Sequence, residues 1–419
     1  MGKVLRSFVC GMLALAGATA AAPSYHPRAA SAAARTFEAE DATLSGTTID
    51  TELTGFTGTG YVTGFSDATD KVTFTLFSMG GASSEVFFAA GETWADVAAG
   101  QLLLNQGSNT IDIVNNWGWY LIDSITLTPS SPRPAHQINE SPVNAAADSG
   151  AKALYKYLRS IYGKKILSGQ QELSWANYIG QQTDLMDYSP SRVERGTVGT
   201  AVEEAIQHHN RGGIVSVLWH WNAPTGLYDT AEQRWWSGFY TAATDFDVAA
   251  ALSSTTNANY TLLIRDIDAI AVQLKRLQTA GVPVLFRPLH EAEGAWFWGP
   301  EPAKKLWGIL YERLTVHHKI NNLIWVWNSI LADWYPGDAT VDILSADVYA
   351  KGNGPMSTQY NQLIELGKDK KMIAASEVGA APLPDLLQAY EAHWLWFAVW
   401  GDSFINNAEW NSLDNLKKN

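Results

Sequence analysis

Four apolar runs in the second half of the chain end in side chains that can do chemistry. The residues that close these runs are His220-Trp221-Asn222, His290-Glu291, Asp347-Val348-Tyr349 and Glu377. Two carboxyl groups that face each other can cleave a glycosidic bond, because one protonates the leaving oxygen while the other attacks the anomeric carbon. In a mechanism that retains configuration the two groups lie about 5 to 5.5 Å apart. The pair Glu291 and Glu377 therefore predicts glycoside hydrolysis.

Two other interpretations compete with this one. A single glutamate at the end of a strand often forms only a salt bridge or a cap. That alternative is weaker for a pair that has His290, Tyr349 and several Trp nearby. A metal site built from His220, His290, Glu291 and Glu293 is the second alternative. It is disfavoured because strand ends supply no close second ligand and the spacing lacks the paired histidines of zincins.

The elements that must position these groups alternate between strand and helix. Apolar runs predict strands at 164–169, 214–219, 282–289, 323–327, 343–348, 372–376 and 394–399, and helical periodicity appears at 260–280, 302–318 and 356–368. Strands that are apolar on both faces and joined by helices indicate a parallel sheet. A (β/α)8 barrel of about 280 residues fits this pattern. An open doubly wound sheet is the runner-up, but no Gly-rich phosphate loop follows the first strand.

The first part of the chain has a different period. Short runs with alternating polarity occur at 60–64, 72–77, 86–89, 101–104, 110–114 and 120–127, with Gly, Asn, Asp and Ser between them. This pattern is typical of a β-sandwich. We predict a signal peptide at 1–22, a leader at 23–35, the sandwich at 36–128, a Pro-rich linker at 129–140 and the barrel at 141–419.

Export follows from the first of these segments. Lys3 and Arg6 precede an apolar stretch that ends at the small-residue site Ala18-Thr-Ala20, as in a secretory signal peptide. The protein is therefore expected outside the cell. We also expect it to be a monomer. Cys10 is the single cysteine and would leave with the signal, so the mature chain would contain no disulfide.

Charge and aromatic content narrow the range of partners. The formal net charge is −13, which disfavours nucleic acid and anionic membranes because both would repel the chain. The chain has 18 tryptophans, whose faces stack well on sugar rings. For a Trp taken at random, packing in a core is the commoner role. A neutral polysaccharide is the expected partner, with no cofactor for catalysis.

The barrel segment resembles glycoside hydrolase family 26, whose members are mostly β-mannanases. The resemblance covers about 280 residues and rests on Arg287-Pro-Leu-His-Glu-Ala-Glu-Gly-Ala-Trp-Phe-Trp-Gly299, Trp219-His-Trp-Asn222, Ser345-Ala-Asp-Val-Tyr349 and Ser376-Glu-Val-Gly379. It implies a retaining mannan endo-1,4-β-mannosidase that cleaves mannan, galactomannan or glucomannan by double displacement.

The resemblance also implies roles for single residues. Glu291 would be the acid/base and Glu377 the nucleophile. The substrate-binding set would be His220, Trp221, Arg287, His290, Trp296, Tyr349 and Trp400, with Trp296 as an aromatic platform and Trp400 as the floor. Burial against Trp296 should raise the pKa of Glu291, whereas donors such as Arg287 should keep Glu377 ionised.

The sandwich segment resembles a family 35 carbohydrate-binding module. The resemblance rests on Thr36-Phe-Glu-Ala-Glu-Asp41 and on Asn115-Asn-Trp-Gly-Trp-Tyr-Leu-Ile-Asp-Ser-Ile-Thr-Leu127. It implies a structural calcium held by Glu38, Glu40 and Asp123, since carboxylate oxygens suit that ion. Solvated acids on an edge strand are the alternative. Trp117 or Trp119 would stack on a sugar.

The chain departs from both families in places. Between Thr48 and Val86 about one hairpin is missing, the segment 178–188 has no apolar run long enough for the second barrel strand, and the chain stops soon after the eighth strand. A barrel without one of its strands cannot close its hydrogen-bond ladder. Two alternatives therefore stay open: a mannan-binding protein without activity, and a related glucanase or xylanase.

Overall fold

The structure is a computed structural model that describes residues 3–5, 7–14, 34–76, 93–104, 109–115, 120–129, 133–171, 182–294, 296, 299–405 and 407–417. Its contacts divide the chain into two compact units. The first unit comprises Met1–Pro134, Gly354–Asn361 and Pro382–Ala392, and the second comprises Ala135–Asn353, Gln362–Ala381 and His393–Asn419. No helix in the described ranges is both long and apolar enough to cross a membrane.

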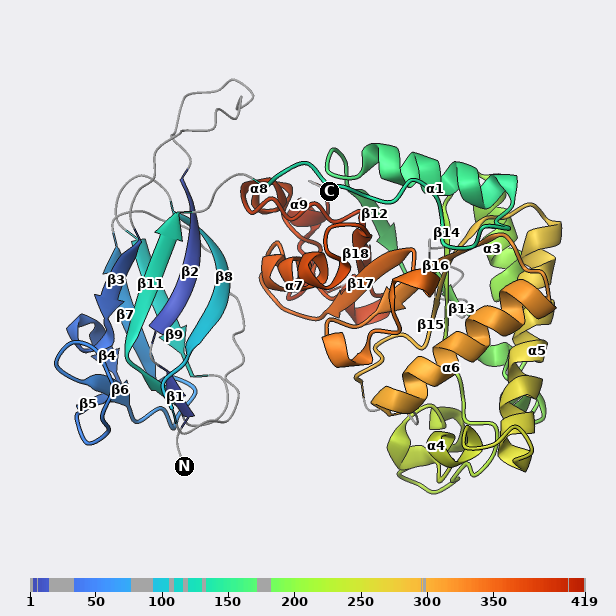
Figure 1. Cartoon of the computed structure of the whole chain (residues 1–419), viewed down its shortest axis with the longest axis horizontal. Helices are drawn as coiled ribbons and strands as arrows, with labels where there is room; N and C mark the ends of the chain where they lie inside the picture. The colour runs from blue at the N-terminus through green and yellow to red at the C-terminus, as the bar shows by residue number, and fades with distance from the viewer. Residues whose placement is uncertain are drawn as a thin grey trace. The chain divides into compact units, whose positions relative to one another are not determined.

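The first unit contains β-sheets, as its alternating pattern predicts (Figure 1). Its strands are β1 Lys3–Leu5, β2 Ser7–Ala14, β3 Arg35–Glu38, β4 Thr43–Ser45, β5 Thr48–Asp50, β6 Tyr61–Thr63, β7 Lys71–Leu76, β8 Asp96–Leu104, β9 Asn109–Val114, β10 Tyr120–Ile122 and β11 Ser124–Pro129. The sheets have the orders β1-β10-β6-β5, β3-β11-β2-β8 and β4-β7-β9. The predicted strand at 86–89 lies outside the described residues.

Alternation along these strands builds one apolar core. Val72 and Phe74 from β7 point into it together with Ile122 and Ile125, and all four are buried. The predicted single strand 120–127 is two strands, because Asp123 interrupts it between β10 and β11. The segment predicted to be a signal peptide also contributes strands here, with β1 parallel to β10 and β2 between β11 and β8.

The second unit is built on one parallel sheet. Its strands are β12 Leu167–Gln170, β13 Gln182–Asp184, β14 Val215–Trp219, β15 Val284–Pro288, β16 Leu323–Asn328, β17 Ile343–Val348, β18 Met372–Val378 and β19 Trp396–Val399. The order is β12-β19-β18-β17-β16-β15-β14-β13, which is the order of a TIM-type barrel. Within the described residues no ladder joins β12 to β13, so the sheet is open between these two strands.

Burial explains why these segments are strands. Every residue of β14, β15, β16, β18 and β19 is buried, as expected for strands covered on both faces. The second strand, which no apolar run predicted, exists as the three-residue β13, which pairs with β14 from Gln182 to Asp184. Register against β14 defines this strand, since its own composition does not.

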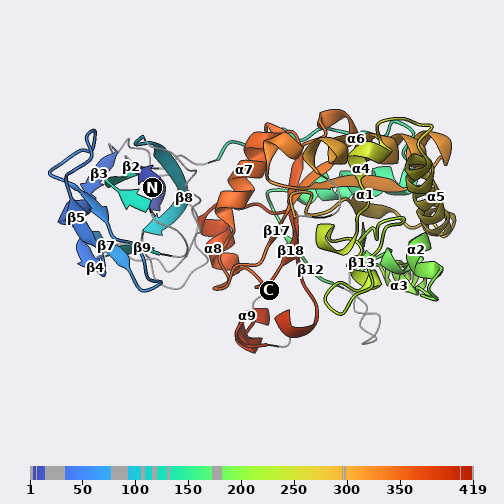
Figure 2. The same cartoon turned by 90° about the horizontal axis from the view of Figure 1, so that it is seen from below.

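Helices lie outside the sheet (Figures 1 and 2). They are α1 Ser149–Ile161, α2 Pro190–Val193, α3 Ala201–Asn210, α4 Val248–Ala251, α5 Ala258–Thr279, α6 Pro300–Glu312, α7 Ser357–Gly367, α8 Pro384–Ala389 and α9 Leu413–Leu416. Helix α1 begins where the Asp148 side chain accepts the N–H of Ala151 at 2.8 Å, a capping bond that satisfies one free backbone donor.

Candidate active site

Arg287 lies at the centre of a buried group of charges. It is the fourth residue of β15 and its side chain has no exposed surface. One guanidinium nitrogen donates to Asp347 at 2.7 Å, and another donates to Glu377. Such a buried pair costs about 3 to 5 kcal/mol when one partner is removed, because the other charge remains without compensation. The guanidinium therefore fixes the positions of two carboxylates from two other strands.

Asn328, the last residue of β16, connects this ion pair to the residues around it. Its Oδ1 accepts from Arg287 at 3.0 Å and also from the backbone N–H of Glu291. Its Nδ2 lies within hydrogen-bond distance of Asp347 Oδ1 at 3.1 Å and Ser376 Oγ at 3.1 Å. The Asn328 side chain therefore holds the backbone of Glu291 in place. It also holds Arg287, which donates to Glu377.

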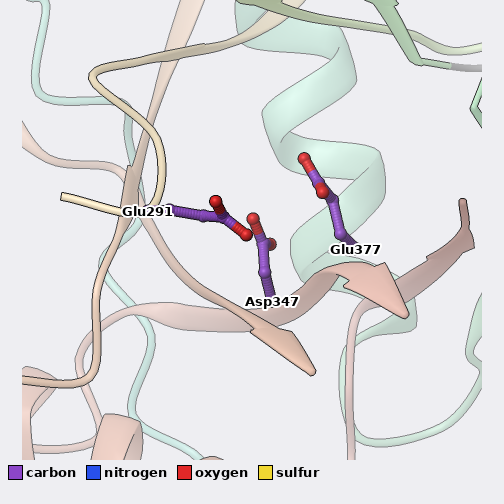
Figure 3. A group of neighbouring side chains, drawn as sticks. All are labelled: Glu291, Asp347 and Glu377. Carbon is purple, nitrogen blue, oxygen red and sulfur yellow. The ribbon is translucent and has the colours of Figure 1, made fainter. Parts of the chain in front are cut away.

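Glu291 stands on a strained turn. Its φ is 46°, and Leu289 two residues earlier has φ 48°. Each such left-handed residue other than Gly costs about 1 to 3 kcal/mol, so surrounding contacts must hold the turn. The bond to Asn328 and a 2.7 Å bond from the N–H of Gly294 to the carbonyl of Glu291 do so. The turn directs the Glu291 carboxyl toward Asp347, as Figure 3 shows.

Three carboxyl groups meet at this point. Glu291, Asp347 and Glu377 each offer an oxygen within 4.8 Å of the others. Figure 3 shows Glu291 on its loop and the other two on neighbouring strands, β17 and β18. Arg287 is already bonded to two of the three, so the cluster has its own fixed positive charge.

Burial changes the acidity of both glutamates. Burial, followed by the neighbouring charge of Asp347, raises the pKa of Glu291 to about 7. The same two causes raise the pKa of Glu377, while Arg287 and the Tyr349 hydroxyl act in the opposite direction. The expectation that only Glu291 would have a raised pKa is wrong, because Glu377 is 3% exposed and loses hydration as well.

Aromatic residues at the strand ends complete this side of the site. Tyr349 follows β17, and its hydroxyl donates to the second oxygen of Glu377 at 2.6 Å. Trp400 follows β19, is half-buried, and its backbone N–H donates to Val378 at 2.9 Å. Tyr349 thus lies where the sequence placed it, and Trp400 closes the eighth strand as expected.

On the other side of Glu291 lies a pair of histidines. Nε2 of His290 lies 3.0 Å from Nε2 of His220, and Nδ1 of His220 lies 2.5 Å from Asp184 at the end of β13. The Trp296 ring lies 5.6 Å from His290 and 5.8 Å from His220, centroid to centroid, and is 6% exposed. These residues form one packed group from three strand ends.

Trp221 does not line an open surface. It has no exposed area, stacks on Trp219 at 4.2 Å, and its indole N–H donates to Asp266 at 3.0 Å. The expectation that its ring faces a sugar is wrong for this structure, because residue 221 points into the packing behind the strand, while His220 points toward His290. Trp221 supports the position of His220 from within the core.

Two residues of the site were not chosen from the sequence, Asn328 and Asp184, and Asp347 was noted at the end of its strand without a role. Asn328 and Asp347 are polar residues at the end of apolar strands, a signal that the sequence does contain. Asp184 gave no such signal, because β13 has no apolar run. The choice of Arg287, His290 and Tyr349 agrees with their positions around the two glutamates.

The acidic residues expected to hold calcium also lie together, in the first unit. The hydroxyl of Thr57 lies 2.8 Å from Glu38 and 3.0 Å from Asp123, and can donate to only one of them at a time. One oxygen of Glu40 accepts the N–H of Thr59 at 2.5 Å. Its other oxygen is buried and has no hydrogen-bond partner in the described part of the chain.

The loop that carries these donors needs a glycine. Gly58 has φ 67°, and a Cβ there would lie 2.1 Å from Glu40. Burial, with Glu38 and Glu40 as additional causes, raises the pKa of Asp123 to about 6. Among the described residues no salt bridge reaches any of the three acids. Trp117 and Trp119, the expected sugar-stacking residues, lie outside the described residues.

Comparisons with protein families agree with both halves of the chain. The model of "Glycosyl hydrolase family 26" matches residues 143–419, and that of "Carbohydrate binding module (family 35)" matches residues 35–77. A "Mannan endo-1,4-beta-mannosidase" of Thermothelomyces thermophilus is 68% identical over 465 positions, which cover 100% of this chain and 96% of the relative. A "Mannan endo-1,4-beta-mannosidase B" of Piromyces sp is 32% identical, over 91% of this chain and 74% of the relative.

A solved structure has the same architecture. It is the Podospora anserina GH26-CBM35 β-(1,4)-mannanase, which is 67% identical and has a TM-score of 0.70, over 92% of this chain and 95% of that one. The match to the Thermothelomyces relative spans 465 positions, whereas this chain has 419 residues. That relative therefore has residues with no counterpart here.

Proposed function

Since this chain belongs to glycosyl hydrolase family 26, we propose that it is an endo-β-1,4-mannanase that cleaves mannan, galactomannan or glucomannan with retention of configuration. The names of its relatives support the activity, because those that are 68% and 67% identical over most of the chain are both mannanases. The observation that carries the mechanism is the cluster of three carboxyl groups around Arg287.

The spacing of the cluster favours retention. An inverting enzyme keeps its carboxyl groups about 6.5 to 9.5 Å apart so that a water molecule fits between sugar and base. One oxygen of Glu291 and one of Glu377 lie within 4.8 Å of each other, which supports the closer of the two spacings and direct attack on the anomeric carbon.

The roles of the two glutamates follow from their partners. Both oxygens of Glu377 accept hydrogen bonds, from Arg287 and from Tyr349, and these donors stabilise its ionised form. Among the described residues Glu291 forms no ion pair. On these hydrogen bonds we assign the proton of the cluster to Glu291, although burial raises the pKa of Glu377 as well. Glu377 is then the nucleophile and Glu291 the acid.

The reaction proceeds in two displacements. An oxygen of Glu377 attacks the anomeric carbon while Glu291 gives its proton to the departing glycosidic oxygen, which leaves a mannosyl ester on Glu377. Glu291, now a carboxylate, takes a proton from an incoming water whose oxygen displaces Glu377. Two inversions restore the β configuration, and both glutamates return to their starting state.

His220, Trp296 and Trp400 are proposed to bind the sugars on either side of the cleaved bond. Their positions support this, since they come from the ends of β14, β15 and β19, on the same edge of the sheet as the two glutamates. Trp117 or Trp119 is proposed to bind mannan in the module.

Calcium is the second ligand that we propose, in the module. Glu38, Glu40 and Asp123 would hold it, and the ion would compensate their charge and order the loop 57–60. Two observations fit the ion: a buried oxygen of Glu40 that has no partner among the described residues, and the raised pKa of Asp123 among like charges. Catalysis would require no cofactor.

We further propose that the protein is secreted as a monomer, with a signal peptide at 1–22, a leader at 23–35, a module at 36–128, a linker at 129–140 and a catalytic domain at 141–419. A mannan-binding protein without activity is the competing function. The observation that favours it is the open sheet between β12 and β13 in the described residues.

A product assay on mannan, β-glucan and xylan separates these functions. We expect new reducing ends from mannan, with at least about tenfold lower rates on the other two polymers. Proton NMR of the first products should show the β anomer before mutarotation. Retention of the chain on mannan without new reducing ends would establish the binding-only function, and initial α anomer would overturn the retaining mechanism.

A further inference from the structure

Asp184 is linked to the site through three hydrogen bonds. Its Oδ2 lies 2.5 Å from Nδ1 of His220, and its Oδ1 accepts the backbone N–H of His220 at 3.0 Å and of Met186 at 2.9 Å. The side chains of Asp184 and His220 are 15% and 13% exposed. The carboxylate therefore determines both the position of residue 220 and the orientation of its ring.

These contacts fix where the protons of two histidines lie. A carboxylate only accepts, so Nδ1 of His220 carries hydrogen, and we assign its Nε2 as the acceptor of the bond to His290. Nε2 of His290, 3.0 Å away, must then be the donor. Nδ1 of His290 is left without hydrogen, and it is buried with no hydrogen-bond partner in the described structure. Burial above all, and the charge of Arg287, lower the pKa of His290, so this ring is neutral.

The hydrogen bonds between Asp184 and His220 and between His220 and His290 form a relay, and His290 connects this relay to the acid/base, Glu291. It is the middle residue of the strained turn, between Leu289 with φ 48° and Glu291 with φ 46°. Its ring is 1% exposed, so the turn cannot shift without moving the ring. The bond between the rings of His290 and His220 therefore holds the turn through a side chain. The bond from the Glu291 N–H to Asn328 holds it through the backbone.

We infer that Asp184 is a positioning residue: it orients His220, and through the bond from His290 to His220 it holds the turn that presents Glu291 to the leaving oxygen. The inference rests on the proposed function, in which Glu291 is the acid. It assigns a role to the short strand β13, because that strand places Asp184 beside β14 by register alone.

The variant Asp184→Asn tests this with little change in shape. If the amide oxygen accepts the two backbone N–H groups, its NH2 group faces Nδ1 of His220, which must give up its hydrogen. The relay then reverses, and His290 carries hydrogen on its buried Nδ1. We expect kcat/KM on mannan to fall about 10- to 100-fold, the usual effect of removing a partner that orients a reactive group.

The identity of the leaving group separates positioning of Glu291 from general damage. Dinitrophenolate departs without a proton, so kcat/KM for 2,4-dinitrophenyl β-mannobioside should fall less than about threefold in Asp184→Asn. Glu291→Ala is the reference variant. Its kcat/KM should depend on the leaving group in the same way, with a larger loss on mannan. Asp187→Asn is the matched control, since this nearby acid is half-exposed and lies 3.7 Å from Arg192. It should keep both rates within about twofold.

NMR of 15N-labelled histidine reads the relay directly in the full chain. The wild type should show hydrogen on Nδ1 of His220 and on Nε2 of His290, and Asp184→Asn should reverse both. Equal losses on the two substrates, or unchanged tautomers in Asp184→Asn, would overturn the inference. If Glu291→Ala shows no dependence on the leaving group, the proposed function itself fails, while the NMR result still decides whether Asp184 controls the relay.

Discussion

The two units each gather three carboxyl groups, but they differ in what compensates the charge. In the second unit Glu291, Asp347 and Glu377 surround Arg287, which has no exposed surface. In the first unit Glu38, Glu40 and Asp123 surround a loop that offers only hydroxyl and backbone donors. One cluster contains a fixed cation and the other, within the described residues, does not.

This difference teaches how the same residue type serves two purposes. A buried guanidinium carries one positive charge against three carboxyl groups, so a proton that can move during a reaction lowers the remaining imbalance. Without a guanidinium, three acids hold an excess of negative charge, most of which a divalent ion can compensate. The first arrangement suits acid/base chemistry and the second suits a structural metal.

The largest expected effect is on the nucleophile. Glu377→Ala should lower the hydrolysis of every mannoside, including aryl mannosides, by more than about 1,000-fold, because no group remains to form the glycosyl ester. Rates on mannan and on an aryl mannobioside measure this. Residual turnover above about one part in a thousand would contradict the assignment and would place the nucleophile elsewhere.

The next effect separates the second glutamate from the first. Glu291→Ala should lose most activity on mannan, yet it should form the glycosyl ester from an aryl mannoside whose leaving group needs no proton. Azide, which needs no deprotonation, should then enter the vacated space and restore turnover. The product should be the β-mannosyl azide. An α-azide, or no rescue, would show that Glu291 is not the acid/base of a retaining enzyme.

Removal of calcium should affect only the unit without a guanidinium. Asp123 has a folded pKa of about 6, above its ordinary value. Without metal, its contribution therefore favours folding at low pH and is lost as pH rises toward and through 6. Calcium reverses this, since it binds the ionised form, and at 100 times its Kd it adds about 2.7 kcal/mol.

Thermal unfolding of the full chain at pH 5 and pH 7, with calcium or with EDTA, measures this effect. We expect the larger stabilisation at pH 7 and none in Asp123→Asn. Activity on soluble oligomannosides should be unchanged by EDTA. A loss of that activity at constant stability would mean that the barrel cluster also needs a metal.

The smallest expected effect on activity is a shift along the pH axis. Asp347→Asn removes a charge that raises the pKa of both glutamates, so both values should fall. Activity requires Glu291 protonated, and it is lost as pH rises above the pKa of that group, about 7 in the wild type. The alkaline limb of kcat/KM should therefore move to lower pH, by about one unit. If the alkaline limb stays at the same pH or moves to higher pH, Asp347 does not set this pKa.

A strand or a site residue could be predicted where the local sequence around it has a recognisable pattern. The seven strands with apolar runs, the two glutamates, and Arg287, His290 and Tyr349 were predicted, because burial on both faces and a polar strand end are written in the local sequence. The strand β13 was not, since three residues that pair with β14 need no apolar run. The burial of Trp221 was also missed, because its motif fits a sugar-facing ring equally well.

The sequence by itself determined that parallel strands end in two glutamates and that an acidic sandwich precedes them, since period, length and residue type are local properties. The tertiary structure alone decided which groups meet. It brought Arg287 to Asp347 and Glu377 from strands 60 and 90 positions later in the chain. It also joined Asp184 to His220, and in the part of the chain that the structure describes it placed no guanidinium beside the acids of the module. Charge compensation acts over a few ångströms in space, so distance along the chain does not reveal it.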